Sequence, residues 1–175
     1  MLYWFFKHIL IGPWLRILFR PWVEGQENIP ESGGVILASN HLSFSDSFYL
    51  AIVAKRPMAY LAKSDYFTGK GIKGYLTKLF MRGVGQLPVD RSGGRASEAA
   101  INTALQVLNA GNILGIYPEG TRSPNGILYR GKTGLARIAL EAHVPIIPSA
   151  MINTYEIQPP GKLRPRLKRV GIRVG

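Results

Sequence analysis

Residues 34–46 read Gly-Val-Ile-Leu-Ala-Ser-Asn-His-Leu-Ser-Phe-Ser-Asp, and this stretch decides the fold. Its first half, 34–39, is short, apolar and rich in branched side chains, which is typical of a buried strand. Residues 47–54 favour a helix, with Ser45 or Asp46 as its N-cap. In open α/β folds, ligands bind where strands end and helices begin. The stretch therefore predicts a functional site at the end of a buried strand.

His41 and Asp46 stand five positions apart in this stretch. On one continuous helix they would point about 140° apart, but across a loop-to-helix turn their side chains can meet. A carboxylate that binds one ring nitrogen of a histidine leaves the other nitrogen free to accept a proton. This general-base pair has no nucleophile of its own, so the reacting hydroxyl must come from a substrate. The alternative is that Asp46 only caps the helix and His41 is only a polar loop residue.

The composition favours one domain with an anionic partner. At 175 residues the chain is long enough to bury a core, and 46% of its residues are hydrophobic. The formal net charge of +12 predicts nucleic acid, anionic lipid or a phosphorylated substrate as partner. No basic recognition helix, zinc finger or aromatic stacking signature is present, so nucleic acid is not expected and a membrane surface is favoured. With no cysteine and three histidines, neither a disulfide nor a metal site is expected.

Residues 1–22 are the most aromatic part of the chain. Lys7, Arg16 and Arg20 interrupt the apolar side chains and Pro13 breaks the run, so neither a spanning helix nor a signal peptide fits. We expect two short helices in the membrane interface, with aromatic rings at headgroup depth and bases on lipid phosphates. This predicts a peripheral or monotopic protein on the cytoplasmic face of the plasma membrane. The alternative is a helix packed on the domain's own core.

The rest of the chain, 23–175, predicts one α/β domain. Short apolar runs alternate with helical segments, which favours a mixed, mostly parallel sheet flanked by helices. The chain ends within an alternating Val/Ile/Arg pattern, which suggests a C-terminal truncation. We expect strands at 34–39, 58–62, 84–89, 113–117 and 145–152, helices at 47–54, 95–109 and 133–143, a loop with a short helix in 63–82, and a further strand or arm beginning in 163–170.

A second polar group, Glu119-Gly120-Thr121-Arg122, follows the strand expected at 113–117. Glycine lets a backbone approach a ligand closely, and the planar arginine fork matches phosphate with two parallel hydrogen bonds. Glu119 could hold Arg122 or bind a substrate hydroxyl, and Arg91, also at a strand end, supplies a second cation. The pattern predicts a phosphate site; the alternative is a surface turn with a salt bridge.

Four motifs in order carry a resemblance to a known family. The chain resembles the glycerolipid acyltransferases of the glycerol-3-phosphate and lysophosphatidic acid type (PlsC-like, with the His-x4-Asp motif) from about Trp22 to Ile152. Pro88 departs from the second motif, which often has an aromatic or branched residue there. The motifs are Asn40-His41-x-Ser43-x-x-Asp46, Gly85-x-x-x-Val89-Asp90-Arg91, Tyr117-Pro118-Glu119-Gly120-Thr121-Arg122-Ser123 and Val144-Pro145-Ile146-Ile147-Pro148.

The resemblance implies a membrane-associated acyltransferase of phospholipid biosynthesis. His41 would be the general base, Asp46 would orient it, and Arg91 would hold the acceptor phosphate together with Glu119, Gly120, Thr121 and Arg122. The donor would be acyl-CoA or acyl carrier protein as co-substrate, with no further cofactor. The acceptor would be lysophosphatidic acid or a glycerol-3-phosphate type of molecule.

Three competing interpretations remain at this stage. Residues 126–133 satisfy the phosphate-loop pattern Gly-x4-Gly-Lys-Thr and precede a helix, which would suggest an NTPase. However, Pro124 and Asn125 separate this pattern from the expected strand, whereas such a loop should follow its strand directly. A basic, membrane-docking lipid-binding protein without chemistry is another alternative. A hydrolase is disfavoured because the chain has no Gly-x-Ser-x-Gly motif.

Overall fold

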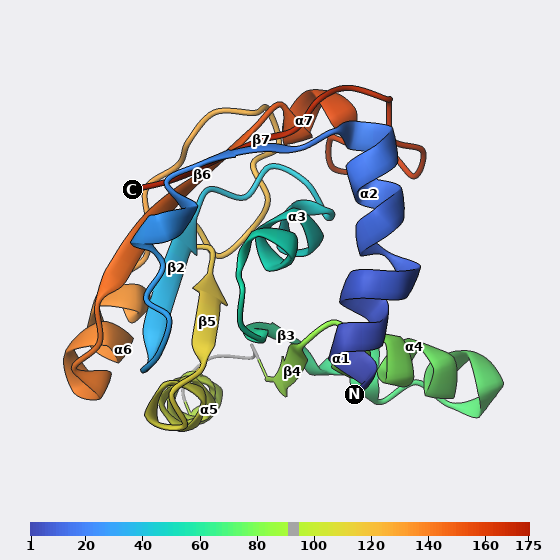
Figure 1. Cartoon of the computed structure of the whole chain (residues 1–175). Helices are drawn as coiled ribbons and strands as arrows, with labels where there is room; N and C mark the ends of the chain where they lie inside the picture. The colour runs from blue at the N-terminus through green and yellow to red at the C-terminus, as the bar shows by residue number, and fades with distance from the viewer. Residues whose placement is uncertain (91–94) are drawn as a thin grey trace.

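The computed structural model describes residues 1–90 and 95–175, and its centre is a seven-stranded sheet (Figure 1). The strand order is β1-β7-β6-β2-β5-β3-β4, and neighbours run parallel except for the antiparallel pair β6 and β7. The predicted mixed, mostly parallel sheet is confirmed. The strands are β1 Trp22–Glu24, β2 Val35–Ser39, β3 Met58–Lys63, β4 Gln86–Val89, β5 Ile113–Ile116, β6 Ile146–Ile152 and β7 Gly171–Val174.

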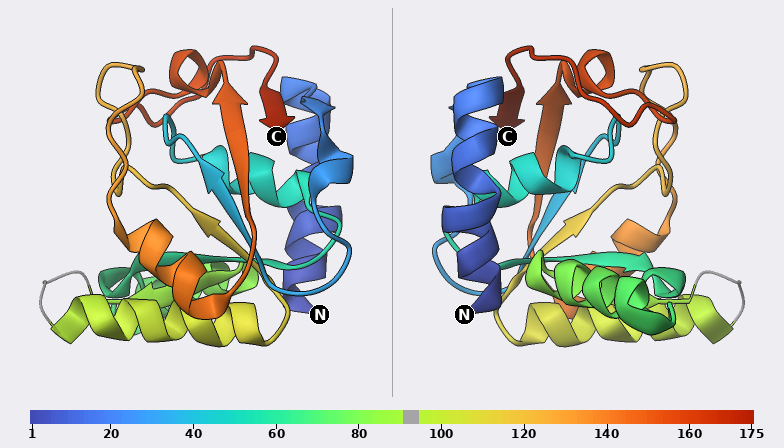
Figure 2. Two further views of the ribbon diagram at one scale, coloured as in Figure 1. Left: turned by 90° about the vertical axis from the view of Figure 1, so that its left-hand side faces the viewer. Right: turned by 90° about the vertical axis from the view of Figure 1, so that its right-hand side faces the viewer.

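Helices cover both faces of the sheet. The helical elements are α1 Leu2–Phe5, a π-helical turn Phe6–Leu10, α2 Gly12–Phe19, a 3-10 turn Gln26–Asn28, α3 Asp46–Val53, a 3-10 turn Ser64–Phe67, α4 Gly71–Gly83, α5 Arg95–Asn109, α6 Gly134–Ala142 and α7 Thr154–Ile157. In Figures 1 and 2, α5 and α6 lie on the opposite side of the sheet from α3 and the N-terminal helices.

The central strand β2 shows why its sequence is apolar throughout. Val35 and Leu37 pack with α3 in one core cluster, whereas Ile36 packs with α5 and α6 in the other. All three side chains are fully buried, as expected for a parallel strand that is covered on both faces. The strand pairs with β5 on one side and β6 on the other, so its carboxyl end opens in the middle of the sheet.

The N-terminal helical segment, 2–19, packs one face on the domain and leaves the other exposed. Its break lies at Ile11 rather than at Pro13, because Pro13 stands in the first turn of α2, where a missing N–H costs nothing. Gly12 and Phe19 are buried, whereas Trp14 and Ile17 are 61% and 66% exposed. In the described part of the chain, no helix is long and apolar enough to cross a membrane.

Two short strands at one edge of the sheet differ from the sequence expectation. β1 was not among the expected strands, and β7 begins only at Gly171, after an arm formed by 163–170. β7 lies between β1 and β6, so it unites residues from both ends of the chain. Pairing of this kind over about 150 residues leaves no local pattern, which is why the sequence did not predict it.

Candidate active site

His41 and Asp46 meet at the carboxyl end of β2. The Nδ1 atom of His41 lies 2.9 Å from Oδ2 of Asp46, which is the first residue of α3 and fully buried. The backbone N–H groups of Leu42 and Ser43 donate to the same Oδ2, each at 2.7 Å. Ser45 is the N-cap residue of α3, but its side chain makes no capping bond. The Asp46 carboxylate therefore orders the loop before the helix as well as the imidazole.

The hydrogen bonds of Asp46 assign the tautomer of His41. Because Oδ2 already accepts two backbone N–H groups, it acts as an acceptor toward Nδ1 as well, and Nδ1 carries the ring proton. The Nε2 atom then keeps its lone pair and can accept a proton. The His41 side chain is 17% exposed, whereas the Asp46 side chain behind it is fully buried.

Tyr117, the residue after β5, stacks on the imidazole. The centroids of the two rings lie 3.8 Å apart with an interplanar angle of 10°. The Tyr117 hydroxyl lies 2.9 Å from the Ser47 hydroxyl, and Tyr60 donates to the Ser47 carbonyl at 3.0 Å. Burial, and next the Asp46 charge, hold the pKa of Tyr117 well above its usual value, so the phenol stays neutral. In the sequence, Tyr117 was only the first residue of the third motif. No local sequence pattern indicated that its ring would stack on His41.

Glu119 binds the loops together rather than pointing at a ligand. Its carboxylate is buried and accepts the backbone N–H of His41 through Oε1 at 3.1 Å and that of Tyr129 through Oε2 at 2.9 Å. The N–H of Ser123 donates back to the His41 carbonyl at 2.7 Å. The loop after β2 and the loop after β5 are thereby locked in register.

An exposed group of residues follows Glu119 and is called the cationic rim below. It comprises Gly120, Arg122 and, from the next loop, Lys132. Gly120 has φ +75°, a conformation that favours glycine, and a Cβ there would lie 3.1 Å from Nζ of Lys132. Thr121 and Arg122 are exposed beside it. The predicted Arg91 lies outside the described residues.

The loop 126–133 does not form a phosphate-binding loop of the NTPase type. Such a loop wraps phosphates with its free backbone N–H groups directly after a strand. Here the N–H of Tyr129 donates to Glu119 and that of Lys132 donates to the Pro118 carbonyl at 2.8 Å. The loop is instead folded against the segment 118–120. Among the residues that the structure describes, no group of three His, Cys, Asp or Glu side chains is placed to hold a metal ion.

Asn40 anchors the site to the sheet. Its side-chain amide donates to the Met151 carbonyl at 3.1 Å and its carbonyl oxygen accepts the Met151 N–H at 2.7 Å. A histidine and aspartate pair at the end of β2, beside a Glu-Gly-Thr-Arg loop at the end of β5, is thus held rigidly on a mostly parallel sheet.

The chain belongs to the Acyltransferase family, whose model matches residues 20–152.

Several acyltransferases from bacteria and plants are similar to the chain in sequence or in structure. A 1-acyl-sn-glycerol-3-phosphate acyltransferase from Bacillus subtilis is 31% identical over 129 residues, which cover 73% of this chain and 60% of that protein. A chloroplastic protein of the same name from Arabidopsis thaliana is 29% identical over 161 residues, covering 89% and 44%. Among solved structures, the 1-acyl-sn-glycerophosphate acyltransferase PlsC from Thermotoga maritima has a TM-score of 0.73 and 28% identity, covering 89% and 59%. The chain spans about half the length of these relatives.

Proposed function

We propose that the chain is an O-acyltransferase that moves a fatty acyl group from a thioester donor, acyl-CoA or acyl carrier protein, to a phosphorylated glycerol acceptor. The acceptor class is lysophosphatidic acid or glycerol-3-phosphate. The observation that carries the proposal is the His41–Asp46 pair, held on a loop that is hydrogen-bonded through Glu119 and Ser123 to the segment carrying Gly120 and Arg122. The similarity to 1-acyl-sn-glycerol-3-phosphate acyltransferases supports the same activity.

The proposed reaction needs a base but no covalent acyl-enzyme. Nε2 of His41 takes the proton of the acceptor hydroxyl as its oxygen attacks the thioester carbonyl. The carbon–sulfur bond then breaks, and the leaving thiolate receives the proton from the imidazolium. Asp46 holds the ring through Nδ1 in both states. General-base help of this kind contributes about 10²–10⁴-fold to the rate, and the thioester itself is already activated.

Tyr117 has a positioning role in this mechanism. Its ring face lies against the imidazole, so His41 is held in one plane by the stack and in one rotation by Asp46. An aromatic face also attracts a cation, which favours the imidazolium that forms during attack. The hydroxyl contact with Ser47 fixes Tyr117 to α3, the helix that carries Asp46.

The acceptor phosphate would lie on the cationic rim. Arg122 offers a planar fork, Lys132 a point charge, and Gly120 a backbone without a side chain next to Lys132. Thr121 adds a hydroxyl and Arg91 a further cation, as the family resemblance implies. In this arrangement Glu119 acts by holding the loop in place.

Membrane attachment is part of the proposal. Trp14 and Ile17 are exposed on α2, with Arg16 and Arg20 beside them. Amphipathic helices with this composition lie in the headgroup region, and each base near an anionic surface adds roughly 1 kcal/mol. We propose a peripheral or monotopic position on the cytoplasmic face of the plasma membrane, where anionic headgroups are abundant.

The activity is tested with purified protein, radiolabelled acyl-CoA or acyl carrier protein, and a panel of phosphorylated acceptors. We expect acyl transfer to lysophosphatidic acid or glycerol-3-phosphate and none to unphosphorylated glycerol. Vesicle binding without transfer to any acceptor would support the silent lipid-binding alternative instead. Acyl-thioester hydrolysis that does not depend on an acceptor would support a hydrolase.

A further inference from the structure

Helix α4 carries an apolar stripe that the rest of the described chain leaves uncovered. Ile72, Tyr75, Leu76 and Leu79 are 82%, 65%, 56% and 39% exposed. At about 100° per residue, these four positions fall within an arc of about 100°. Scattered exposed apolar residues need no explanation, but a contiguous stripe on one helix marks an interaction surface.

Along most of its length α4 uses the opposite face for the fold, and only in its last turn does Gly83 also pack on Phe6. Met81 is buried with Phe67 and Ala62 in a small core cluster. Gly74 packs so closely on Gly69 that a Cβ would lie 2.1 Å from the Gly69 carbonyl carbon. Since the helix is already anchored by its inward face, the outward stripe has no role in the core.

Basic side chains border the stripe on both sides. Between Asp65 and Asp90 the chain has no acidic residue, whereas four bases fall on or next to α4. By the same helical spacing, Lys73 lies along one edge of the stripe and Lys78 and Arg82 along the other. Long basic side chains can extend from an apolar surface to headgroup phosphates. A face with an apolar centre and basic edges complements an anionic bilayer.

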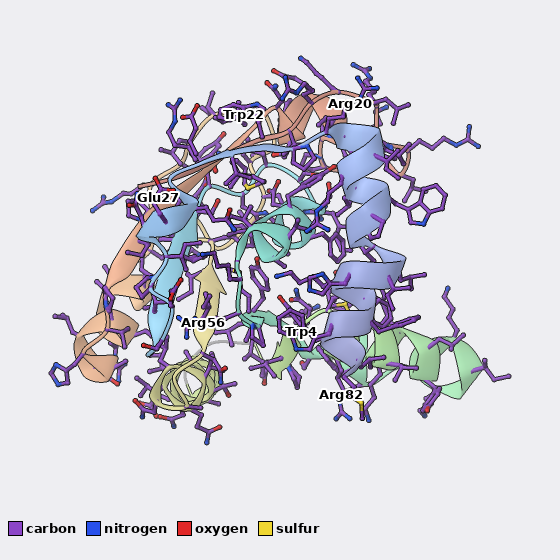
Figure 3. All side chains as sticks on the ribbon, viewed as in Figure 1. Trp4, Arg20, Trp22, Glu27, Arg56 and Arg82 are labelled. Carbon is purple, nitrogen blue, oxygen red and sulfur yellow. The ribbon has the colours of Figure 1, made fainter. Side chains whose placement is uncertain are left out.

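Helix α4 lies on the same side of the molecule as the N-terminal helical segment. The rings of Phe6 and Phe80 meet edge to face at 5.6 Å, and a Cβ on Gly83 would lie 2.6 Å from the Phe6 ring. Figures 1 and 2 show α4 leaving the foot of this segment, away from α5 and α6. Figure 3 places Arg82 near that foot and Arg20 at the far end of α2.

We propose that α4 is a second membrane-docking element, with its apolar stripe in the headgroup region of an anionic bilayer. The proposal rests on the membrane attachment in the proposed function and deepens it. One helix alone would leave the protein free to rotate about the axis of that helix. Two docked helices that meet at an angle define a plane, so they fix how the active site faces the lipid surface.

The first test measures binding to vesicles of phosphatidylglycerol and phosphatidylcholine by co-sedimentation. The double variant Ile72→Ser, Leu76→Ser should bind at least tenfold more weakly, because two inserting side chains are lost. Its control is Leu140→Ser on α6, a leucine that is 75% exposed on the other side of the sheet. Unchanged binding of the double variant would overturn the proposal. Both variants should keep the wild-type melting temperature and acyl transfer to a water-soluble acceptor in detergent, which separates docking from chemistry.

The second test examines the basic edges. Replacing Lys73 and Arg82 by Gln should reduce binding to anionic vesicles about fivefold per base, which corresponds to roughly 1 kcal/mol each. Binding to vesicles of phosphatidylcholine alone should change little. An equal loss on both kinds of vesicle would contradict the role given to the charges.

The third test places a probe on the stripe. The chain has no cysteine, so Leu76→Cys can carry a single polarity-sensitive fluorophore. Its emission should shift to the blue when vesicles are added, and the same label on Leu140→Cys should not respond. A silent probe at position 76 on fully bound protein would refute docking by α4. A wild-type dimer in solution that the double serine variant dissociates would refute it too, since a second copy would then cover the stripe.

Discussion

At the scale of single residues, the site depends on two buried carboxylates that hold the imidazole and the backbone of the loops around it. Asp46 Oδ2 serves two backbone N–H groups and the imidazole, and both oxygens of Glu119 are occupied by backbone N–H groups. On the His41 ring, Nδ1 is bound to Asp46 and Nε2 is the nitrogen that can accept a proton. The strand before this stretch and the helix after it could both be recognised in the sequence. The five-residue spacing therefore predicted that the side chains of His41 and Asp46 would meet. It did not predict the Tyr117 stack, which arises only because β5 pairs with β2.

Tyr117 offers a residue-scale test of the stack. We expect Tyr117→Leu to lower kcat at least about tenfold with little change in acceptor KM, because the imidazole loses its fixed plane while the cationic rim stays intact. Tyr117→Phe should keep most of the activity, since it retains the ring and loses only the hydroxyl contacts with Ser47 and Tyr60. Steady-state kinetics decide, and equal losses in both variants would show that the hydroxyl, not the ring face, is what matters.

Arg122 tests the phosphate site. Arg122→Ala should raise the KM for the phosphorylated acceptor at least about tenfold, the range for losing a hydrogen bond to a charged group, while the donor KM stays near the wild-type value. Arg164→Ala, an exposed arginine in the arm 163–170, is the matched control. A rise in the donor KM alone would mean that the rim holds the donor's phosphates instead.

At the scale of elements, the apolar runs predicted most of the sheet and the long helix α5, whose bounds match the expected 95–109. α4 was expected to be a short helix within a loop, because its three glycines and dispersed lysines conceal its periodicity. Its 13 residues are stabilised by packing on β4 and on the 3-10 turn Ser64–Phe67. Helix propensity alone therefore did not determine the length of α4, and its contacts with other elements did.

Lys7 couples the N-terminal segment to the helix that carries Asp46. Its buried ammonium donates to the carbonyl of Ala54 at the end of α3. Burial, and then the Arg16 charge, lower the pKa of Lys7 from 10.5 to about 8. Because the folded-state pKa lies below the unfolded value, the folded protein loses this proton first, and the free energy of unfolding rises with pH between about 8 and 10.5.

The prediction is a pH-dependent difference in stability. Between pH 7 and pH 9.5, the wild type should gain about 2 kcal/mol in free energy of unfolding relative to Lys7→Met, from a single group with this shift. Urea unfolding at the two pH values measures it. Parallel pH profiles for the two proteins would show that Lys7 is not the titrating group.

The exposed face of α2 can be used to test the proposed membrane attachment of this helix. Trp14→Ser with Ile17→Ser should weaken vesicle binding at least about tenfold without changing the melting temperature, since both side chains are exposed. Deleting 1–20 would be a poorer test, because it removes the Lys7 contact and takes Phe19 out of the core. Unchanged vesicle binding would show that α2 faces water.

At the scale of the whole molecule, the site is assembled from segments that are distant in sequence. The turn 40–46, the segment 117–123 and the loop 126–133 meet because β2 and β5 are neighbours in the sheet, and Asn40 adds β6 through Met151. The order of the motifs along the chain predicted the family, whereas only the sheet order reveals which motifs touch. The N-terminal segment and α4 then lie together on one side, as a membrane surface requires.

The most direct measurement of the central claim is the turnover of His41→Ala in acyl transfer to the phosphorylated acceptor, with vesicle binding recorded on the same sample. We predict a fall in kcat of at least about 10²-fold, because the base that takes the hydroxyl proton is gone. Vesicle binding and acceptor KM should stay close to wild type. Turnover near the wild-type value would contradict the account, since the imidazole would then not be the base.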